Sequence, residues 1–285
     1  MNPLIVPLPG HQAFASRLAL RLGAELAPGV AHRPPPAVPV RGREVVLVSS
    51  LQRSERQLLP LLMLARRTRH QGATGLFLVT PHLVLPEGDG AAGALRQTLG
   101  RHFDGIVSVQ GGDARMLLPP WGVAAAGPAL GREIAARCPQ PLLVAVGGVM
   151  RWTETIAVEL QAPLLSAGGF ATAAAGHCHE LLDDSDPVLL ADAVGDGLAI
   201  LRLARELRRR GTAPPLVAVI HADFAPGAVA RLAPPEVAGV ISTNTVLHPS
   251  NRVDVSEAVA DAIWRLWSST LSPIRSTGLA VAAAR

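Results

Sequence analysis

Asp186-Pro-Val-Leu-Leu-Ala-Asp-Ala-Val-Gly-Asp-Gly-Leu-Ala-Ile-Leu-Arg-Leu-Ala-Arg-Glu-Leu-Arg-Arg-Arg210 predicts a strand, a tight glycine turn and a helix. The apolar run 188–190 forms the strand, Gly195 and Gly197 interrupt it, and apolar side chains then return at helical spacing. Such a turn aims backbone N–H groups and a helix N-terminus at one point, which favours an anion there. Asp196 stands among those donors, so its carboxylate competes with an anionic ligand for them.

The same alternation of strand and helix runs along the chain. Further strands are predicted at 4–8, 44–49, 75–80, 105–109, 142–146, 162–166, 216–220 and 239–242. Further helices are predicted at 12–26, 59–70, 91–101, 153–160, 227–232 and 255–267, with Pro60 in the first turn of its helix. This rhythm is typical of parallel sheets covered by helices, so the expected fold class is α/β.

The length of 285 residues allows two domains of about 140 residues, each with its own core. The predicted hinge lies between Pro119 and Cys138. We therefore expect domains at 1–128 and 129–267, followed by a mobile Ser- and Ala-rich tail at 268–285.

Composition excludes several classes of protein. Hydrophobic residues make up 49% of the chain, yet no apolar run approaches the roughly 20 residues of a membrane span. The first ten residues lack a basic region and a cleavage site, which predicts a cytoplasmic protein without membrane partners. Cys138 and Cys178 provide no disulfide framework and are expected to be free thiols.

All basic residues are arginine, because the sequence contains no lysine. Mechanisms that need a lysine of this chain, such as a Schiff base or a Walker-type phosphate loop, are therefore excluded. Five arginines lie on and just after one predicted helix: Arg202, Arg205, Arg208, Arg209 and Arg210. They suit the negative end of the helix dipole or a nucleic acid, and an aromatic content of 3% favours the first interpretation. No nucleic-acid partner is expected.

Other side chains are candidate ligands for a metal or a small molecule. The run Gly176-His-Cys-His-Glu180, with Asp183 and Asp184, offers donors for zinc or copper, but its spacing is poor, and a solvated loop without metal is expected. His221 and His248 lie near strand ends, where ligands collect in α/β sheets, or are simply bonded within loops.

Two further possibilities are less specific. The turn Pro9-Gly10-His11 brings a helix N-terminus close to a strand end and is a weak candidate for an anion site. Serine, histidine and aspartate are all present, but no Gly-x-Ser-x-Gly motif occurs, so hydrolase chemistry is not expected.

Residues 3–267 resemble the ribose-phosphate pyrophosphokinase family, also called phosphoribosyl pyrophosphate (PRPP) synthetases. The similar strings are Pro60-Leu-Leu-Met-Leu-Ala-Arg-Arg-Thr-Arg-His-Gln-Gly-Ala73, His102-Phe-Asp-Gly-Ile-Val-Ser-Val109, His221-Ala-Asp-Phe-Ala225, Ser242-Thr-Asn-Thr-Val-Leu-His-Pro-Ser-Asn251 and Val253-Asp-Val-Ser256. The resemblance implies two phosphoribosyltransferase-like domains, each a mainly parallel sheet flanked by helices. It also implies a homo-oligomer.

That family transfers a pyrophosphoryl group from Mg-ATP to ribose 5-phosphate, and its charged motifs are altered here. The ATP-binding Arg-Gln-Asp-Arg falls at Glu87-Gly-Asp89-Gly90, and the Asp-x-His that holds metal and ATP falls at Gln110-Gly-Gly112. The adenine-contacting segment falls at 34–39, the lysine-arginine loop at the uncharged 166–171, and the Pro-Asp motif near Val146-Gly147. Replacing cations by an anion turns attraction for a polyanion into repulsion.

The family's ribose-phosphate loop falls at 191–199 and is degenerate at Asp192, Gly195, Asp196 and Gly197. Asp192 still suits the ribose hydroxyls, whereas Asp196 replaces a hydroxyl donor to the 5′-phosphate. Each lost charge partner costs roughly 10² to 10³ in rate, so no catalytic residue is assigned.

The sequence therefore predicts a pseudoenzyme of nucleotide biosynthesis, without metal or cofactor. It would act as a binding or regulatory paralogue of the synthetase, either as a homo-oligomer or as a hetero-oligomer with an active synthetase. The alternative is an active ribose-phosphate pyrophosphokinase that uses Mg²⁺ and ATP.

Overall fold

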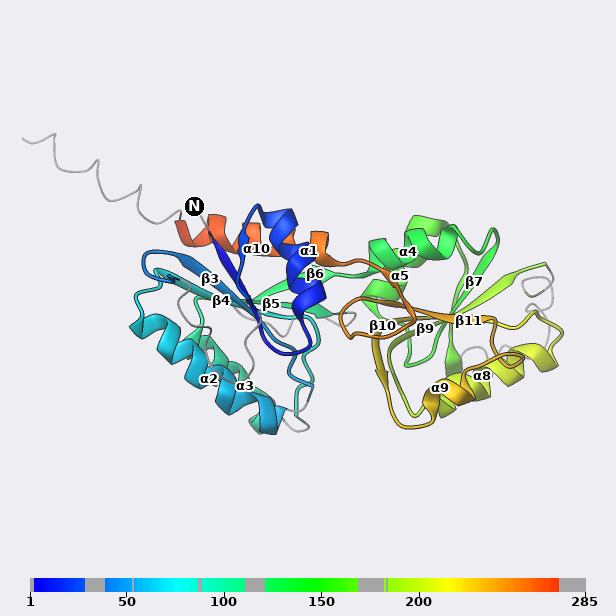
Figure 1. The fold of residues 1–285 in the computed structure, drawn as a ribbon. Coiled ribbons are helices and arrows are strands. Elements are labelled where there is room, and N and C mark those ends of the chain that lie inside the picture. The colour runs from blue at the N-terminus through cyan, green and yellow to red at the C-terminus, as the bar shows by residue number, and fades with distance from the viewer. Residues whose placement is uncertain are drawn as a thin grey trace, which may run out of the picture. The chain divides into compact units, whose positions relative to one another are not determined.

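The computed structural model describes residues 3–28, 39–52, 54–86, 89–110, 121–168, 182 and 184–271. Contacts between residues divide the chain into two units (Figure 1). Unit 1 comprises Met1–Ser108, Leu117–Ala124 and Ser256–Arg285, and unit 2 comprises Val109–Met116 and Ala125–Val255. Each unit contains one six-stranded sheet with helices on its faces, so the predicted α/β fold is confirmed.

Unit 1 has the strand order β2-β1-β3-β4-β5-β6. Its strands are β1 (Leu4–Pro7), β2 (Glu25–Leu26), β3 (Glu44–Val48), β4 (Gly75–Thr80), β5 (Gly105–Gln110) and β6 (Trp121–Ala125). Helices α2 (Ser54–His70) and α3 (Asp89–His102) cover one face, and α1 (Gln12–Leu22) and α10 (Ser256–Leu271) cover the other (Figure 1). The pairs β1–β2, β1–β3, β3–β4 and β4–β5 are parallel. Helices cover both faces of the sheet, which explains why the inner strands β1, β3 and β4 are nearly continuous apolar runs.

Unit 2 has the strand order β12-β11-β10-β9-β7-β8, and each of these pairs is parallel. Its strands are β7 (Pro141–Ala145), β8 (Leu164–Ser166), β9 (Asp186–Gly195), β10 (Leu216–Phe224), β11 (Gly239–Thr243) and β12 (Asn251–Val253). Helices α8 (Leu198–Arg209) and α9 (Ala228–Arg231) lie on one face, and α4 (Gly127–Ala135) and α5 (Arg151–Leu160) lie on the other (Figure 1). Four side chains of α8 enter the core, namely Ile200, Leu201, Ala204 and Leu207.

Several element boundaries differ from the predictions. Strand β9 continues to Gly195 because it pairs with β10 up to Phe224, well beyond the apolar run that predicted it. The short edge strands β2, β6 and β12 were not predicted, and α4 occupies the stretch expected to be a hinge. Helix α2 begins at Ser54, so Pro60 lies inside the helix and not in its first turn.

The last helix belongs to a different unit from the one predicted. Helix α10 was assigned to the second domain, 129–267, but it packs in unit 1 beside α1. Its Val259, Ile263 and Trp267 side chains are buried, and the Trp267 ring meets the Phe77 ring of β4 edge to face at 5.8 Å. The chain therefore crosses back to unit 1 after Val255, and the crossing into unit 2 near Ala125 lies close to the predicted boundary at 128.

The expected tail at 268–285 begins as the last turn of α10, which runs to Leu271. Residues 272–285 lie outside the described part of the chain. Across the described ranges, no helix combines the length and apolar character needed to span a bilayer.

Candidate functional site

The topology of unit 2 marks one end of its sheet as the place for a ligand. Strand β8 lies on one side of β7, and β9, β10, β11 and β12 follow on the other side, so the strand order reverses between β7 and β9. Parallel sheets bind ligands beyond the carboxyl ends of the strands at such a reversal. The carboxyl end of β9 leads into the β9–α8 turn, which contains the predicted loop residues Gly195, Asp196 and Gly197.

The backbone of the β9–α8 turn requires its two glycines. Gly195 has φ of 59° and Gly197 has φ of 73°, both in the left-handed region that glycine adopts freely. A Cβ atom on Gly197 would also lie 3.3 Å from side-chain atoms of Leu232. The carbonyl of Gly195 accepts a hydrogen bond from the Ala225 N–H at 2.8 Å, so the turn is held against the end of β10.

The Asp196 carboxylate uses a donor of the β9–α8 turn. Its Oδ1 accepts a hydrogen bond from the N–H of Leu198, the first residue of α8, at 3.0 Å. The Gly197 N–H donates to the Val194 carbonyl at 3.1 Å, and Arg231 Nη1 donates to the Asp196 carbonyl, also at 3.1 Å. The side chains of Asp192 and Asp196 are both exposed at this edge. A negative side chain thus takes up the start of α8, where the helix dipole favours an anion.

The strand on the other side of the reversal contributes no charge. After β7, residues 146–149 read Val-Gly-Gly-Val, and Gly148 has φ of 100°. Among the described residues, no group of three or more His, Cys, Asp or Glu side chains is arranged to hold a metal ion.

Several predicted site residues cannot be placed in this arrangement. Glu87 and Gly112 lie outside the described residues, as do 34–38, 169–171, 176–180 and Asp183. Asp89 begins α3 and Gln110 ends β5, and only their backbone is described. Asp184 has φ of 63° in the turn before β9.

His221 and His248 belong to polar networks at the ends of β10 and β11. The buried His221 places Nδ1 2.9 Å from Thr245 Oγ1. His248 Nδ1 lies 2.7 Å from Ser250 Oγ and accepts the Ser250 N–H at 3.1 Å, while its ring stacks on Phe224 at 4.3 Å. Burial lowers the pKa of His248. Both histidines are engaged within the chain, but only His248 lies in a loop, because β10 extends to Phe224 and includes His221.

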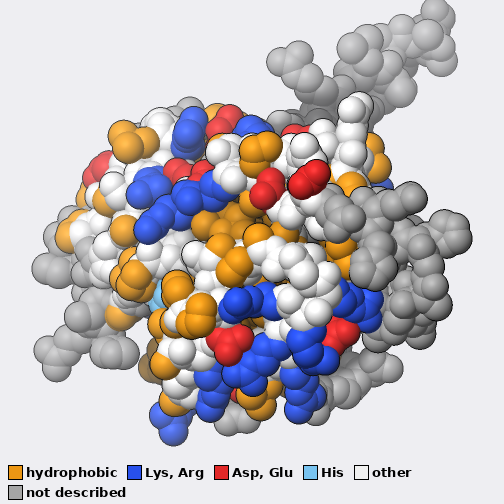
Figure 2. Space-filling view, turned by 90° about the vertical axis from the view of Figure 1, so that its right-hand side faces the viewer, with side chains coloured by type: hydrophobic (Ala, Val, Ile, Leu, Met, Phe, Trp, Pro, Cys, Tyr) orange, Lys and Arg blue, Asp and Glu red, His pale blue; other side chains and the backbone are white. Residues whose placement is uncertain are grey.

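The arginines of α8 gather over the lower part of the unit 2 surface in Figure 2. Arg205 pairs with Glu236 at 2.9 Å, and Arg208 donates to the Pro235 carbonyl at 2.7 Å. Arg209 and Arg210 both pair with Glu206, at 2.7 and 3.0 Å. These contacts tie the end of α8 to its own turn and to the segment before β11, as expected for cations at a helix C-terminus.

A second polar cluster lies at the carboxyl end of the unit 1 sheet and was not predicted from the sequence. It joins His11, Ser50, Gln52 and His82, which follow three different strands. Only the helix start at His11 had been noted. Burial raises the pKa of the Cys138 thiol to about 11, so this thiol is not activated as a nucleophile.

These features define a protein of two parallel α/β units. In unit 2, the β9–α8 turn lies at the reversal of strand order, and the Asp196 carboxylate occupies the start of α8. The crystal structure of phosphoribosylpyrophosphate synthetase from Mycobacterium smegmatis matches 94% of this chain and 100% of its own, with a TM-score of 0.75 and 19% identity. A match at this identity shows a shared fold. A lac repressor dimer bound to operator and an anti-inducer gives a TM-score of only 0.36 at 12% identity, covering 95% of this chain and 76% of the repressor, and supports no argument.

Sequence comparison points in the same direction. Ribose-phosphate pyrophosphokinase 1 of Archaeoglobus fulgidus is 31% identical over 80 residues, which is 28% of this chain and 28% of that protein. The match thus spans little more than a quarter of the relative, and no family model matches the chain. Together, the fold and this local similarity confirm the resemblance to PRPP synthetases.

Proposed function

We propose that this chain is a PRPP synthetase-like protein of ribose-phosphate and nucleotide metabolism that has lost most of the pyrophosphokinase reaction and acts by binding or regulation. The observation that carries the proposal is the Asp196 carboxylate on the Leu198 N–H at the start of α8. In the resembling family, the corresponding loop receives the sugar 5′-phosphate. A carboxylate at this position repels a phosphate and competes for its hydrogen-bond donor.

The altered nucleotide positions support the same proposal. Glu87 and Gly90 stand where the family has the two arginines of its ATP-binding motif, and Gln110 and Gly112 stand where it has Asp and His. Stabilisation of developing charge is usually the largest single contribution to catalysis, and phosphoryl transfer depends on it almost entirely. Several simultaneous losses leave a scaffold suited to binding.

A direct assay tests the proposal. Purified protein is incubated with ATP, ribose 5-phosphate and Mg²⁺, and AMP is measured over time, with an authentic synthetase as the positive control. We expect no AMP above the rate in buffer. Steady turnover would instead support the alternative, an active ribose-phosphate pyrophosphokinase that uses ATP and Mg²⁺. The name of the Archaeoglobus relative is the observation that favours this alternative.

The proposal includes assembly with itself or with an active synthetase. A binding or regulatory role needs a contact surface outside the former catalytic site. The family resemblance implies such a surface, because it implies oligomeric contacts. Co-expression with an active synthetase, followed by affinity capture and light scattering, measures both kinds of assembly. Recovery of the chain only as a monomer in both experiments would contradict this part.

A further inference from the structure

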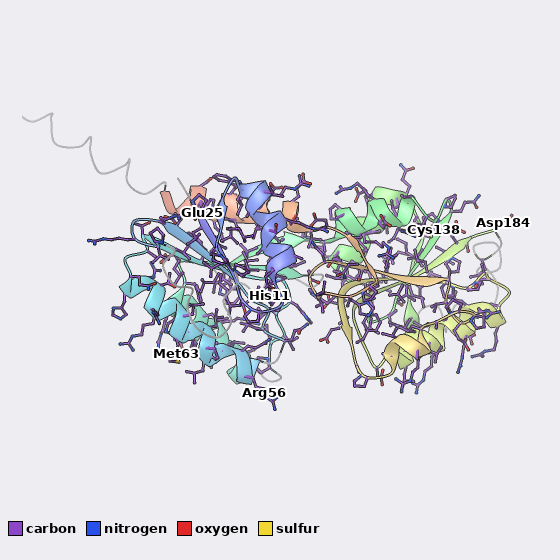
Figure 3. All side chains as sticks on the ribbon, in the orientation of Figure 1. His11, Glu25, Arg56, Met63, Cys138 and Asp184 are labelled. Atoms are coloured by element: carbon purple, nitrogen blue, oxygen red, sulfur yellow. The ribbon has the colours of Figure 1, made fainter. Side chains whose placement is uncertain are left out.

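The topology of unit 1 also contains a reversal, between β1 and β3, because β2 lies beyond β1 and β4 lies beyond β3. Two polar residues follow these strands directly. His11 lies between β1 and α1 as the N-cap residue of α1, where it is labelled in Figure 3, and Ser50 comes two residues after β3. In this kind of fold, a ligand crevice is expected at the reversal between β1 and β3. Here a contact between His11 and Ser50, which are 39 residues apart, bridges that place.

Hydrogen bonds define which nitrogen of His11 carries the proton. Nε2 accepts the Ser50 N–H at 2.9 Å and lies 2.9 Å from Ser50 Oγ. A backbone N–H only donates, so Nε2 is the unprotonated nitrogen. Nδ1 lies 3.1 Å from the Pro9 carbonyl, which only accepts, so Nδ1 carries the hydrogen. Since the lone pair of Nε2 is already engaged by the Ser50 N–H, His11 is not a free general base toward the Ser50 hydroxyl.

The contact reaches a third strand through Ser50. Ser50 is buried, and its Oγ accepts the N–H of His82, which follows β4, at 3.2 Å. Gln52 Nε2 in turn donates to His82 Nδ1 at 3.0 Å. Ser50 thus connects the ends of three neighbouring strands through His11 and His82, and we call His11, Ser50 and His82 the clasp.

Protonation has opposite effects on the two sides of the His11 ring. A hydrogen on Nε2 would face the Ser50 N–H, so a hydrogen bond would be replaced by two opposed donors. The bond from Nδ1 to the Pro9 carbonyl would survive. We propose that the clasp is released by acid: uptake of one proton at His11 Nε2 detaches the β1–α1 turn from Ser50 and opens the β1/β3 crevice.

The surroundings of His11 hold the clasp closed near neutrality. Burial lowers the pKa of His11, and hydrogen bonds to the carbonyls of Pro9 and Leu8 oppose that effect. No charged side chain in the described part of the chain contributes to the shift. Among the described residues in hydrogen-bond contact with the clasp, the other titratable group is His82 itself. A depressed histidine pKa means that the clasp stabilises the fold above the ordinary value of 6.5 and is lost as pH falls through the lower, folded-state value.

Nuclear magnetic resonance of the full chain tests the proposal. Long-range ¹H–¹⁵N spectra at pH 7 should show His11 as the Nδ1–H tautomer. Hydrogen exchange of the Ser50 amide, corrected for the intrinsic effect of pH, should accelerate at least about 10-fold as His11 titrates. Constant protection of Ser50 through that titration would overturn the proposal. The amide of Val46, in the core of β3, reports that the unit remains folded.

Two variants and one internal control sharpen the test. His11→Gln places an amide oxygen near the position of Nε2, so Ser50 should stay protected at every pH; His11→Phe has no acceptor and should lose the protection even at pH 7. If Ser50 exchange in His11→Gln accelerated with acid as in the wild type, the proposal would fail. His102 is the internal control, because its Nδ1 faces the Thr98 carbonyl at 2.8 Å and keeps that bond when protonated.

Discussion

At the scale of the residue, the proposed loss of phosphate binding depends most directly on the Asp196 carboxylate. Asp196 accepts the Leu198 N–H, and Asp192 adds a second negative charge to the same edge. Replacing Asp196 with threonine removes the competing charge and supplies a hydroxyl donor. We expect phosphate or ribose 5-phosphate to bind at least about 10-fold more tightly, measured by calorimetry, which is about 1.4 kcal/mol.

The control for this substitution is Asp261→Thr, which removes the same charge from an exposed position of α10 in unit 1. It should leave phosphate affinity unchanged. Unchanged or weaker binding by Asp196→Thr would contradict the account of the β9–α8 turn.

A second residue-scale prediction concerns a carboxylate of β3. Burial and the nearby Asp104 raise the pKa of Glu44, which Arg69 offsets in part, and Glu44 Oε2 is buried without a hydrogen-bond partner. A raised folded-state pKa stabilises the fold below the ordinary value of 4.5, and this contribution is lost as pH rises through the folded value. Glu44→Gln should therefore be more stable than the wild type at pH 7, by less than about 1 kcal/mol, and not at pH 4.

Urea unfolding at both pH values measures this difference. Glu25→Gln is the matched control, because Glu25 pairs with Arg43 at 2.9 Å and its neutralisation should lower stability slightly at pH 7. Equal stability changes for Glu44→Gln at pH 4 and pH 7 would rule out the proton linkage.

At the scale of the element, the passage from β9 to α8 depends on backbone conformation. Gly197→Ala forces a Cβ into a left-handed residue and to 3.3 Å from Leu232, so we expect a loss of about 2 kcal/mol in the free energy of unfolding. Gly195 also has a left-handed φ, but a Cβ atom there would meet no other atom within 4 Å. Gly195→Ala should therefore lower the free energy of unfolding by only about 1 kcal/mol. Chemical denaturation compares the two; an equal loss would show that Leu232 yields to the methyl group.

At the scale of the whole molecule, the chain forms unit 1 from both of its ends. Trp267 of α10 is only 2% exposed and meets Phe77, so Trp267→Ala should destabilise unit 1 by about 3 to 5 kcal/mol and leave unit 2 unchanged. Hydrogen exchange measured by mass spectrometry resolves the two units. Trp264→Ala, at a residue 45% exposed, should have a much smaller effect. Faster exchange in unit 2 instead would contradict the assignment of α10.

Part of the candidate site was predictable from sequence because it is local. Asp196 and Leu198 are two residues apart, so a glycine turn before an amphipathic helix was enough to indicate competition for the helix N–H groups. The clasp was not predictable in this way, because His11 and Ser50 are 39 residues apart and meet only when β1 and β3 pair.

The amino-acid sequence by itself determined the alternation of strands and helices, since short continuous apolar runs and apolar spacing of 3.6 residues are properties of neighbouring residues. Tertiary structure alone decided the strand order, the two reversals and the return of α10 to unit 1. It also extended β9 to Gly195 through pairing with β10. These features depend on which distant apolar faces bury one another, and the local pattern of a segment does not specify its partner.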